Sequence, residues 1–136
     1  MWNLYEAQQA GHDEVILLNE RGEVAECTAA NIFCVTGGRV ATPPLSSGCL
    51  EGVTRGILLE IGPRAGIPVE EQTLFPEDLH SASEVFISST NRNVIAVGEI
   101  GGHKIAAGSG PVMEKLGQAF SAYVREYVEA RTAASR

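Results

Sequence analysis

Apolar and polar residues follow one another along the first third of the chain in short stretches that predict a helix and two hairpins. Leu4 and Ala7 fall at helical spacing ahead of Gly11, so a helix is predicted over residues 2–10. This helix would begin at the initiating methionine without a capping residue, which suggests that a preceding segment has been cut away. The stretches that follow predict two antiparallel hairpins, formed by residues 14–18 with 23–26 and by residues 31–35 with 40–42.

The rest of the chain alternates helices with strands. One helix is expected over residues 51–65, where Pro63 ends or bends it, and another over residues 111–130, where Pro111 occupies the first position. The segments between them are predicted as strands at 69–74 and 84–88, a turn or short helix at 76–82, and a hairpin of 94–100 with 103–106. The pattern as a whole predicts an α+β fold, with more strand than helix in its first two-thirds.

One face of the last predicted helix is apolar. It consists of Val112, Leu116, Ala119, Phe120, Tyr123, Val124 and Tyr127. A helix face of this kind more often packs in a core or against another subunit than holds a cofactor. We therefore expect this face in the core or at a subunit contact.

Composition limits the classes of protein to which the chain can belong. Its 136 residues are enough for one domain with a sizeable core, which we assign as residues 1–136. The formal charge of −7, with only the two lysines Lys104 and Lys115, argues against a nucleic-acid surface. The sequence has no apolar run long enough to cross a membrane and no signal-peptide pattern at its start. The expected location is therefore cytoplasmic.

Cysteines and histidines are too dispersed to predict a metal site. Cys27, Cys34 and Cys49 lack C-x-x-C spacing, and the three histidines are far apart in the sequence. Zinc ligands normally come in pairs at short spacing, so we expect no metal. Buried, unreactive thiols are the expected role of the cysteines.

A loop of small residues before the helix predicted at 51–65 is a candidate anion site. Residues 46–54 read Ser-Ser-Gly-Cys-Leu-Glu-Gly-Val-Thr, and backbone N–H groups at a helix start have no helical partner. Gly52 permits close approach of a ligand, and Thr54 adds a hydroxyl donor. A second group of hydroxyls at residues 88–91 follows an apolar strand, where it can bind an anion or simply cap the next turn.

Glu26 is the candidate charged group. It ends a predicted strand and precedes the small residues 27–30. Most glutamates at such positions are solvated, and a buried one would need a cationic partner, of which a protonated pyridine nitrogen is one example. The sequence carries none of the short motifs of serine hydrolases, zinc metalloproteases or dinucleotide-binding oxidoreductases.

The order of these segments resembles the class IV (fold-type IV) aminotransferases. This pyridoxal-phosphate family includes branched-chain aminotransferases, D-amino-acid aminotransferases and aminodeoxychorismate lyases. The resemblance covers almost the whole chain and rests on residues 14–26, Asn31-Ile-Phe33, Thr42-Pro-Pro44, Leu50-Glu-Gly-Val-Thr-Arg55, Glu84-Val-Phe-Ile-Ser-Ser-Thr90 and Gly110-Pro-Val112. It implies the C-terminal, cofactor-binding domain of such an enzyme, an antiparallel-rich sheet or barrel with flanking helices, truncated at its N-terminus.

The family's cofactor contacts carry over to four residues in the first half of the chain. Glu26 matches the carboxylate that pairs with the pyridine nitrogen and keeps it protonated, so that the ring can act as an electron sink. Leu50 matches the residue that packs against the pyridine ring. Val53 and Thr54 match the helix-start residues whose N–H groups and hydroxyl hold the cofactor phosphate.

Three further positions lie in the hydroxyl-rich group. The resemblance makes Thr90 another phosphate ligand and places Ser89 and Asn91 near the phosphate and the substrate carboxylate. The family's Schiff-base lysine corresponds to a position upstream of this chain, and neither Lys104 nor Lys115 matches it. The resemblance therefore implies no catalytic residue within the chain itself.

The leading expectation is pyridoxal-phosphate-dependent transamination of an amino acid to a 2-oxo acid, of the branched-chain type. The complete enzyme would perform this reaction, and the present chain would be a fragment that is inactive alone. The alternatives are an aminodeoxychorismate-lyase-type enzyme, a non-catalytic domain that binds the cofactor non-covalently or serves in oligomerisation, and an enzyme whose other half is a separate polypeptide. Apolar surface exposed by truncation, including Trp2, Leu4 and Tyr5, predicts a homodimer.

Overall fold

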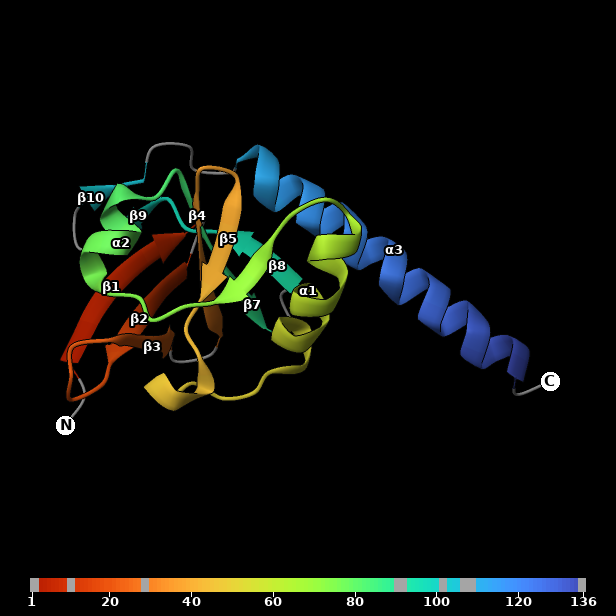
Figure 1. The fold of residues 1–136 in the computed structure, drawn as a ribbon, viewed down its shortest axis with the longest axis horizontal. Coiled ribbons are helices and arrows are strands. Elements are labelled where there is room, and N and C mark those ends of the chain that lie inside the picture. The colour runs from red at the N-terminus through yellow and green to blue at the C-terminus, as the bar shows by residue number, and fades with distance from the viewer. Residues whose placement is uncertain are drawn as a thin grey trace.

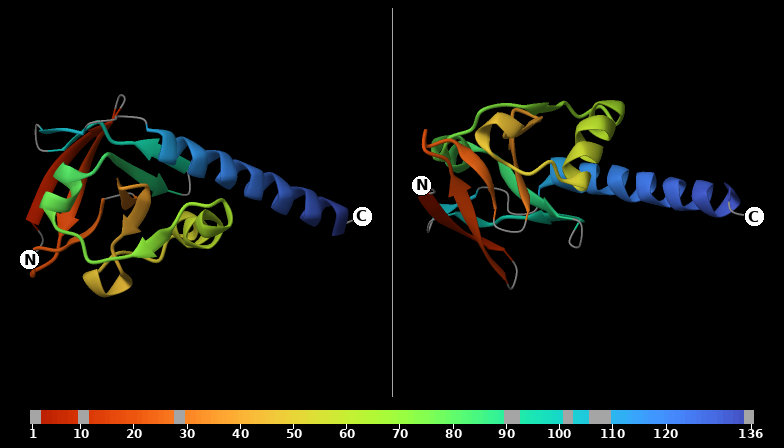
Figure 2. Two further views of the ribbon diagram at one scale, coloured as in Figure 1. Left: turned by 45° about the horizontal axis from the view of Figure 1, so that its top comes forward. Right: turned by 90° about the horizontal axis from the view of Figure 1, so that it is seen from below.

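Two five-stranded sheets and three α-helices make up the part of the chain that the structure describes (Figure 1). The structure is a computed structural model, and it describes residues 3–9, 12–27, 30–89, 93–100, 103–105 and 110–134. The first sheet lies at the N-terminal end of the long axis, whereas α1 and α3 lie on the far side of the second sheet (Figures 1 and 2). The α+β prediction is therefore confirmed.

The first sheet has the strand order β10-β9-β1-β2-β3, and all its pairs are antiparallel. Its strands are β1 (Asn3–Gln9), β2 (His12–Leu18), β3 (Val24–Cys27), β9 (Glu99–Ile100) and β10 (His103–Lys104). The hairpin of β2 with β3 is the one that the sequence predicts, and Gly22 in its turn has φ +78°. The hairpin of β9 with β10 is also confirmed.

The helix predicted over residues 2–10 is wrong, because this segment forms β1. The strand pairs with β2 along its whole length, from Asn3 opposite Leu18 to Gln9 opposite His12, and with β9 on its other edge. Backbone pairing on both sides outweighs the weak helical spacing of Leu4 and Ala7, which is a local signal only. Since no helix begins here, the missing cap says nothing about a preceding segment.

The second sheet has the strand order β6-β5-β4-β7-β8. Its strands are β4 (Asn31–Thr36), β5 (Arg39–Thr42), β6 (Val69–Glu71), β7 (Glu84–Ser89) and β8 (Asn93–Ala96). The β4–β5 hairpin turns through Gly37 and Gly38, whose φ angles of +59° and +78° suit a tight two-residue turn. Only β5 and β6 are parallel, as expected for strands joined through a helix.

The strand predicted over residues 94–100 is divided between the two sheets. Residues up to Ala96 pair with β7, whereas Glu99 and Ile100 pair with β1. The backbone N–H of Val97, a buried residue, donates to the carbonyl of Val85. The chain therefore crosses from one sheet to the other at residues 97–98, between the edge strand β8 and the inner strand β9.

The helices are η1 (Leu45–Ser47, a 3-10 turn), α1 (Val53–Arg64), α2 (Pro76–Ser81) and α3 (Pro111–Ala134). The prediction for α1 is confirmed, with Pro63 in its last turn. One core lies between the two sheets, and a second lies between the second sheet and α1 with α3. In the second core the rings of Phe33 and Phe86 stack at 4.9 Å.

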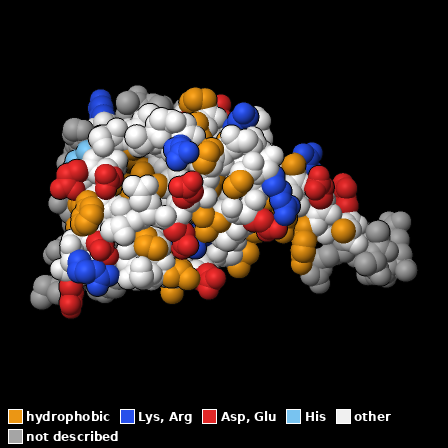
Figure 3. Space-filling view, in the orientation of Figure 1, with side chains coloured by type: hydrophobic (Ala, Val, Ile, Leu, Met, Phe, Trp, Pro, Cys, Tyr) orange, Lys and Arg blue, Asp and Glu red, His pale blue; other side chains and the backbone are white. Residues whose placement is uncertain are grey.

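Only the first half of α3 belongs to the core. Leu116 and Phe120 are buried against α1 and the second sheet, as the apolar pattern predicts. Val124 and Tyr127 are 39% and 50% exposed, so they lie outside the core, and a subunit contact at these two residues stays a prediction. The last turns extend past the body of the molecule (Figure 1), and up to residue 130 this part of the helix is exposed, with both apolar and charged side chains on its surface (Figure 3). None of the helices in the described residues is long and apolar enough to span a membrane.

Candidate cofactor site

Glu26 lies near the end of β3 and contacts the loop that leads into α1. Its side chain is half-buried, while its neighbours Ala25 and Cys27 are fully buried. Oε1 of Glu26 accepts the backbone N–H of Leu50 at 2.6 Å. Within the described part of the chain, Oε2 of Glu26 accepts no hydrogen bond. One carboxylate oxygen is thus fixed by the protein, and the other remains available to a donor.

Leu50 is held by its backbone and leaves its side chain outside. The Nδ2 group of Asn31 donates to the Leu50 carbonyl at 3.0 Å, and so does the N–H of Gly52. The Leu50 side chain is nevertheless 73% exposed. An exposed leucine on a fixed backbone, next to a carboxylate, offers an apolar contact surface at a defined place.

The start of α1 is the anion-binding end of the site. Gly52 is the N-cap residue and supplies no side chain to the first N–H groups, and the first turn contains no acidic residue. The N–H groups of Val53 and Thr54 belong to the first turn, where no helical carbonyl precedes them and the helix dipole favours an anion. Val53 is 69% exposed and Thr54 is buried. This confirms a helix start at the predicted residues.

The end of β7 adjoins the same loop. Ser88 pairs with Asn31 across the β4–β7 ladder, so the two side chains lie on the same face of the sheet as Phe33 and Phe86. Ser88 is 1% exposed, and its hydroxyl has no hydrogen-bond partner in the described residues. A buried hydroxyl without a partner is costly, so a donor or acceptor supplied by a ligand would stabilise it.

The remaining predicted site residues are the last residue of β7 and the two residues after it in the sequence. Ser89 ends β7, where its backbone pairs with Asn93, and its side chain is not among those that the structure describes. Thr90 and Asn91 lie outside the described residues. The structure therefore brings Glu26, Leu50, Val53 and Thr54 together and leaves these three positions as predictions.

Arg55, for which the sequence predicts no role, anchors the first turn of α1. The residue is 3% exposed. Nη2 donates to the Pro43 carbonyl at 3.0 Å and to Oε2 of Glu71 at 2.5 Å. These bonds tie the helix start to the preceding loop and to β6. Nothing in the sequence distinguishes this arginine from a solvated one, because its partners lie 12 and 16 residues away.

A polar network holds the loop from its other end. The Glu23 carboxylate accepts hydrogen bonds from Arg21, from Asn19 and from the Ser47 hydroxyl at 3.0, 2.8 and 3.2 Å. These partners, Arg21 first, lower the pKa of Glu23 to about 2. Asn19 and Arg21 also donate to backbone carbonyls of Ser47 and Ser46 in η1. The β2–β3 turn thereby anchors the segment that precedes Leu50.

All three cysteines are free and buried, as predicted. Burial raises the pKa of the Cys34 thiol to about 12 and raises that of Cys49 as well, although the Arg55 charge opposes the shift at Cys49. Thiols with raised pKa values are poor nucleophiles at neutral pH. Cys49 directly precedes Leu50 and acts in the site as a small packed side chain.

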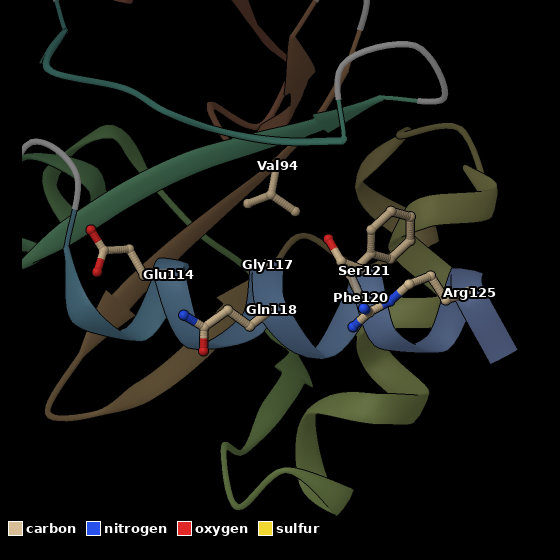
Figure 4. A pocket seen from close by; sticks show the side chains of 7 residues that line it. All are labelled: Val94, Glu114, Gly117, Gln118, Phe120, Ser121 and Arg125. Carbon is tan, nitrogen blue, oxygen red and sulfur yellow. The ribbon is translucent and has the colours of Figure 1, made fainter.

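A separate groove lies away from the candidate site. A groove of about 560 Å³ runs between Val94 of β8 and one side of α3, where Glu114, Gln118 and Arg125 line it (Figure 4). None of the predicted site residues lines this groove. Lys104 on β10 and Lys115 on α3 are exposed, and neither lies on an element that forms the candidate site.

Comparison with known proteins decides the family. The model of the family described as amino-transferase class IV matches residues 2–100. The chain belongs to the class IV aminotransferases. The matched stretch contains every candidate site residue, whereas α3 lies beyond it.

Relatives of this aminotransferase chain are branched-chain enzymes. That of Pseudomonas aeruginosa is 36% identical over 131 residues, which cover 96% of this chain and 42% of the relative. The solved structure from Escherichia coli aligns with a TM-score of 0.77 and 37% identity, over 82% of this chain and 38% of that one. The structure from Thermobaculum terrenum, described as its PLP form, aligns with a TM-score of 0.79 and 30% identity, over 85% and 38%.

The match to these relatives covers the fold of this chain and a part of their length. The α+β fold is that of the branched-chain aminotransferase structures over the aligned part. The chain spans about 40% of the length of the relatives that it matches.

Proposed function

We propose that this chain forms the pyridoxal-phosphate-binding part of an enzyme that transaminates amino acids to 2-oxo acids, of the branched-chain type. One observation carries the proposal: the Glu26 carboxylate is bonded to Leu50, four residues before Thr54 in the first turn of α1. Pyridoxal phosphate has a basic ring nitrogen at one side, a flat ring, and a phosphate. The site presents an acceptor carboxylate, an exposed leucine and a helix N-terminus next to one another.

The residues fit this cofactor at both of its polar ends. With Oε1 of Glu26 fixed by the Leu50 N–H, Oε2 is the atom that would hold the proton of the ring nitrogen. The bound cofactor supplies an electron sink for the substrate's α-carbon, and a protonated ring nitrogen strengthens it. The N–H groups of Val53 and Thr54 would hold the phosphate, and the buried Ser88 hydroxyl is a polar group on the same side that lacks a partner in the described residues.

Three further residues complete the proposed site. Thr90 would bind the phosphate, with Ser89 beside it, and Asn91 would lie near the substrate carboxylate. Their place at the end of β7 and directly after it supports this assignment, because Ser88 of the same strand pairs with Asn31. Transamination is favoured over lyase chemistry because the relatives reported above are branched-chain aminotransferases.

We further propose that the lysine that attaches the cofactor lies outside this chain, which is then inactive by itself. Lys104 and Lys115 are both exposed and lie on β10 and α3, away from the site elements. A cytoplasmic location and a homodimer remain predictions.

Pyridoxal phosphate binding to the purified chain tests the proposal. Absorbance titration should show reversible binding, and borohydride reduction followed by mass spectrometry should show no stable adduct. Glu26→Gln and Thr54→Val should each weaken binding by about tenfold, since each removes one charged or hydrogen-bonding contact. Glu114→Gln, on the α3 groove, is the control and should bind normally. Equal binding by all variants would contradict the site, and an adduct on Lys104 or Lys115 would contradict the absence of an attaching lysine.

A further inference from the structure

The side chain of Asn31 contacts the loop before α1 through both of its polar atoms. Asn31 is the first residue of β4 and is 7% exposed. Its Nδ2 donates to the Leu50 carbonyl at 3.0 Å. Its Oδ1 lies where a side chain of residue 52 would begin, since a Cβ on Gly52 would collide with this oxygen. One amide therefore fixes Leu50 by attraction and excludes any side chain at residue 52.

The backbone conformation of Gly52 does not explain why this residue is glycine. Its φ of −68° and ψ of 147° are extended values that any residue adopts. It is also the N-cap of α1, where serine, threonine, asparagine or aspartate would stabilise the helix better than glycine does. The close contact with Asn31 is therefore the physical reason for glycine at this position.

Glu26 of β3 and Asn31 of β4 each form a hydrogen bond with the backbone of Leu50. Glu26 accepts its N–H at 2.6 Å, and Asn31 donates to its carbonyl at 3.0 Å. The carboxylate, the exposed leucine and the start of α1 are thus held in one arrangement. Removing the Asn31 amide would free the carbonyl end and allow the helix start to move relative to Glu26.

We propose that Asn31 is a positioning residue of the cofactor site, and that Gly52 is its obligatory partner. Asn31 sets the distance between the residue that holds the ring nitrogen and the helix start that holds the phosphate. This role rests on the proposed function, because it matters to a ligand that binds at both points. The mutual contact of Asn31 and Gly52 is independent of any ligand and can be tested alone.

Thermal unfolding of four variants tests the contact. Gly52→Ala should lower Tm by on the order of 5–10 °C, because its Cβ collides with the Asn31 amide. In the Asn31→Ala background the same change should cost little, since the nearest atom beyond the Asn31 amide, Cβ of Arg55, lies at 3.9 Å, an ordinary contact distance. Gly56→Ala is the control: a Cβ on this exposed helical glycine would meet no atom within 4 Å, and alanine there should raise Tm. An equal cost of Gly52→Ala in both backgrounds would overturn the contact.

Pyridoxal phosphate affinity tests the positioning role. Asn31→Asp keeps the shape of the side chain but removes the donor to Leu50, and it should weaken binding by about tenfold. Leu79→Ala removes a buried side chain between the sheets, away from the site, so it should lower Tm and leave affinity unchanged. If Asn31→Asp binds as tightly as the unaltered chain, Asn31 does not position the site. If the unaltered chain binds no cofactor, the proposed function fails, while the unfolding cycle still decides whether Asn31 and Gly52 are in contact.

Discussion

The starts of α1 and α3 are built alike and completed differently. Each helix follows a glycine whose missing Cβ makes room for a polar side chain of the sheet: Asn31 against Gly52, and Glu84 against Gly110. Glu84, 3% exposed, accepts the N–H of Val112 at 3.1 Å and that of Met113 at 2.9 Å through its two carboxylate oxygens. Asn31 instead donates to the carbonyl of Leu50, three residues before the helix.

The start of α3 therefore serves the fold, whereas the start of α1 belongs to the candidate site. A carboxylate at a helix start satisfies its N–H groups and complements its dipole, so the start of α3 is already occupied by the protein. The first turn of α1 contains no acidic residue and has a glycine cap. No acidic side chain in this turn complements the dipole, while Asn31 and Arg55 fix the position of the helix start without neutralising it.

The largest expected effect on stability concerns the contact of Glu84 with the start of α3. Glu84→Ala leaves two N–H groups of α3 without their charged acceptor in a buried place. It should lower the free energy of unfolding by about 3 kcal/mol, measured by urea denaturation. Glu114→Ala, an exposed acidic residue in the same turn, should cost less than about 1 kcal/mol. A comparable loss in both variants would mean that Glu84 acts only through its charge near the helix and not through its bonds.

Gly110 should show the next largest effect. A Cβ at this position would collide with the Glu84 carboxylate, so Gly110→Ala should destabilise the chain by about 1–3 kcal/mol. Gly117→Ala, further along α3 where a Cβ meets no atom within 4 Å, should instead stabilise it by about 0.5–1 kcal/mol. Chemical denaturation of the two variants measures the contrast. Stabilisation by Gly110→Ala would show that Glu84 can move aside freely.

The smallest expected effect concerns Glu23, whose hydrogen bonds hold the segment that leads to the start of α1. The pKa of Glu23 is lowered from 4.5 to about 2 by Arg21, Asn19 and Ser47. A lowered pKa means that the charged carboxylate stabilises the fold fully above about pH 4.5 and that this stabilisation is lost as the pH falls toward 2. Glu23→Gln should therefore have a lower Tm than the unaltered chain at pH 6, and the two should converge as the pH approaches about 2. A difference that stays constant with pH would contradict this account.

The sequence predicts the parts of the fold that depend on local signals. The β4–β5 hairpin is predictable because Gly37 and Gly38 favour a tight turn between two apolar stretches, and α3 because its apolar residues repeat at helical spacing. The wrong helix at residues 2–10 has the opposite origin, since β1 is a strand only because β2 and β9 lie beside it. The division of residues 94–100 between two sheets likewise depends on partners distant in the chain.

In the candidate site, too, one part could be predicted from the sequence and another could not. The resemblance to a family supplied Glu26, Leu50, Val53 and Thr54, and the structure brings them together. It could not supply the bonds among them, because Glu26 and Leu50 are 24 residues apart, and Asn31 and Leu50 are 19 apart. The burial of the Ser88 hydroxyl is also a property of packing alone, so the residue types do not reveal it.

Amide chemical shifts of the isotope-labelled chain during titration with pyridoxal phosphate test the central claim most directly. The account predicts shifts at Leu50, Val53 and Thr54, weaker shifts at the helix start with pyridoxal, which lacks the phosphate, and none at Val112 or Met113. Shifts at Val112 and Met113, with the amides of Val53 and Thr54 unchanged, would contradict the claim that the anion binds at the start of α1 and not at the start of α3.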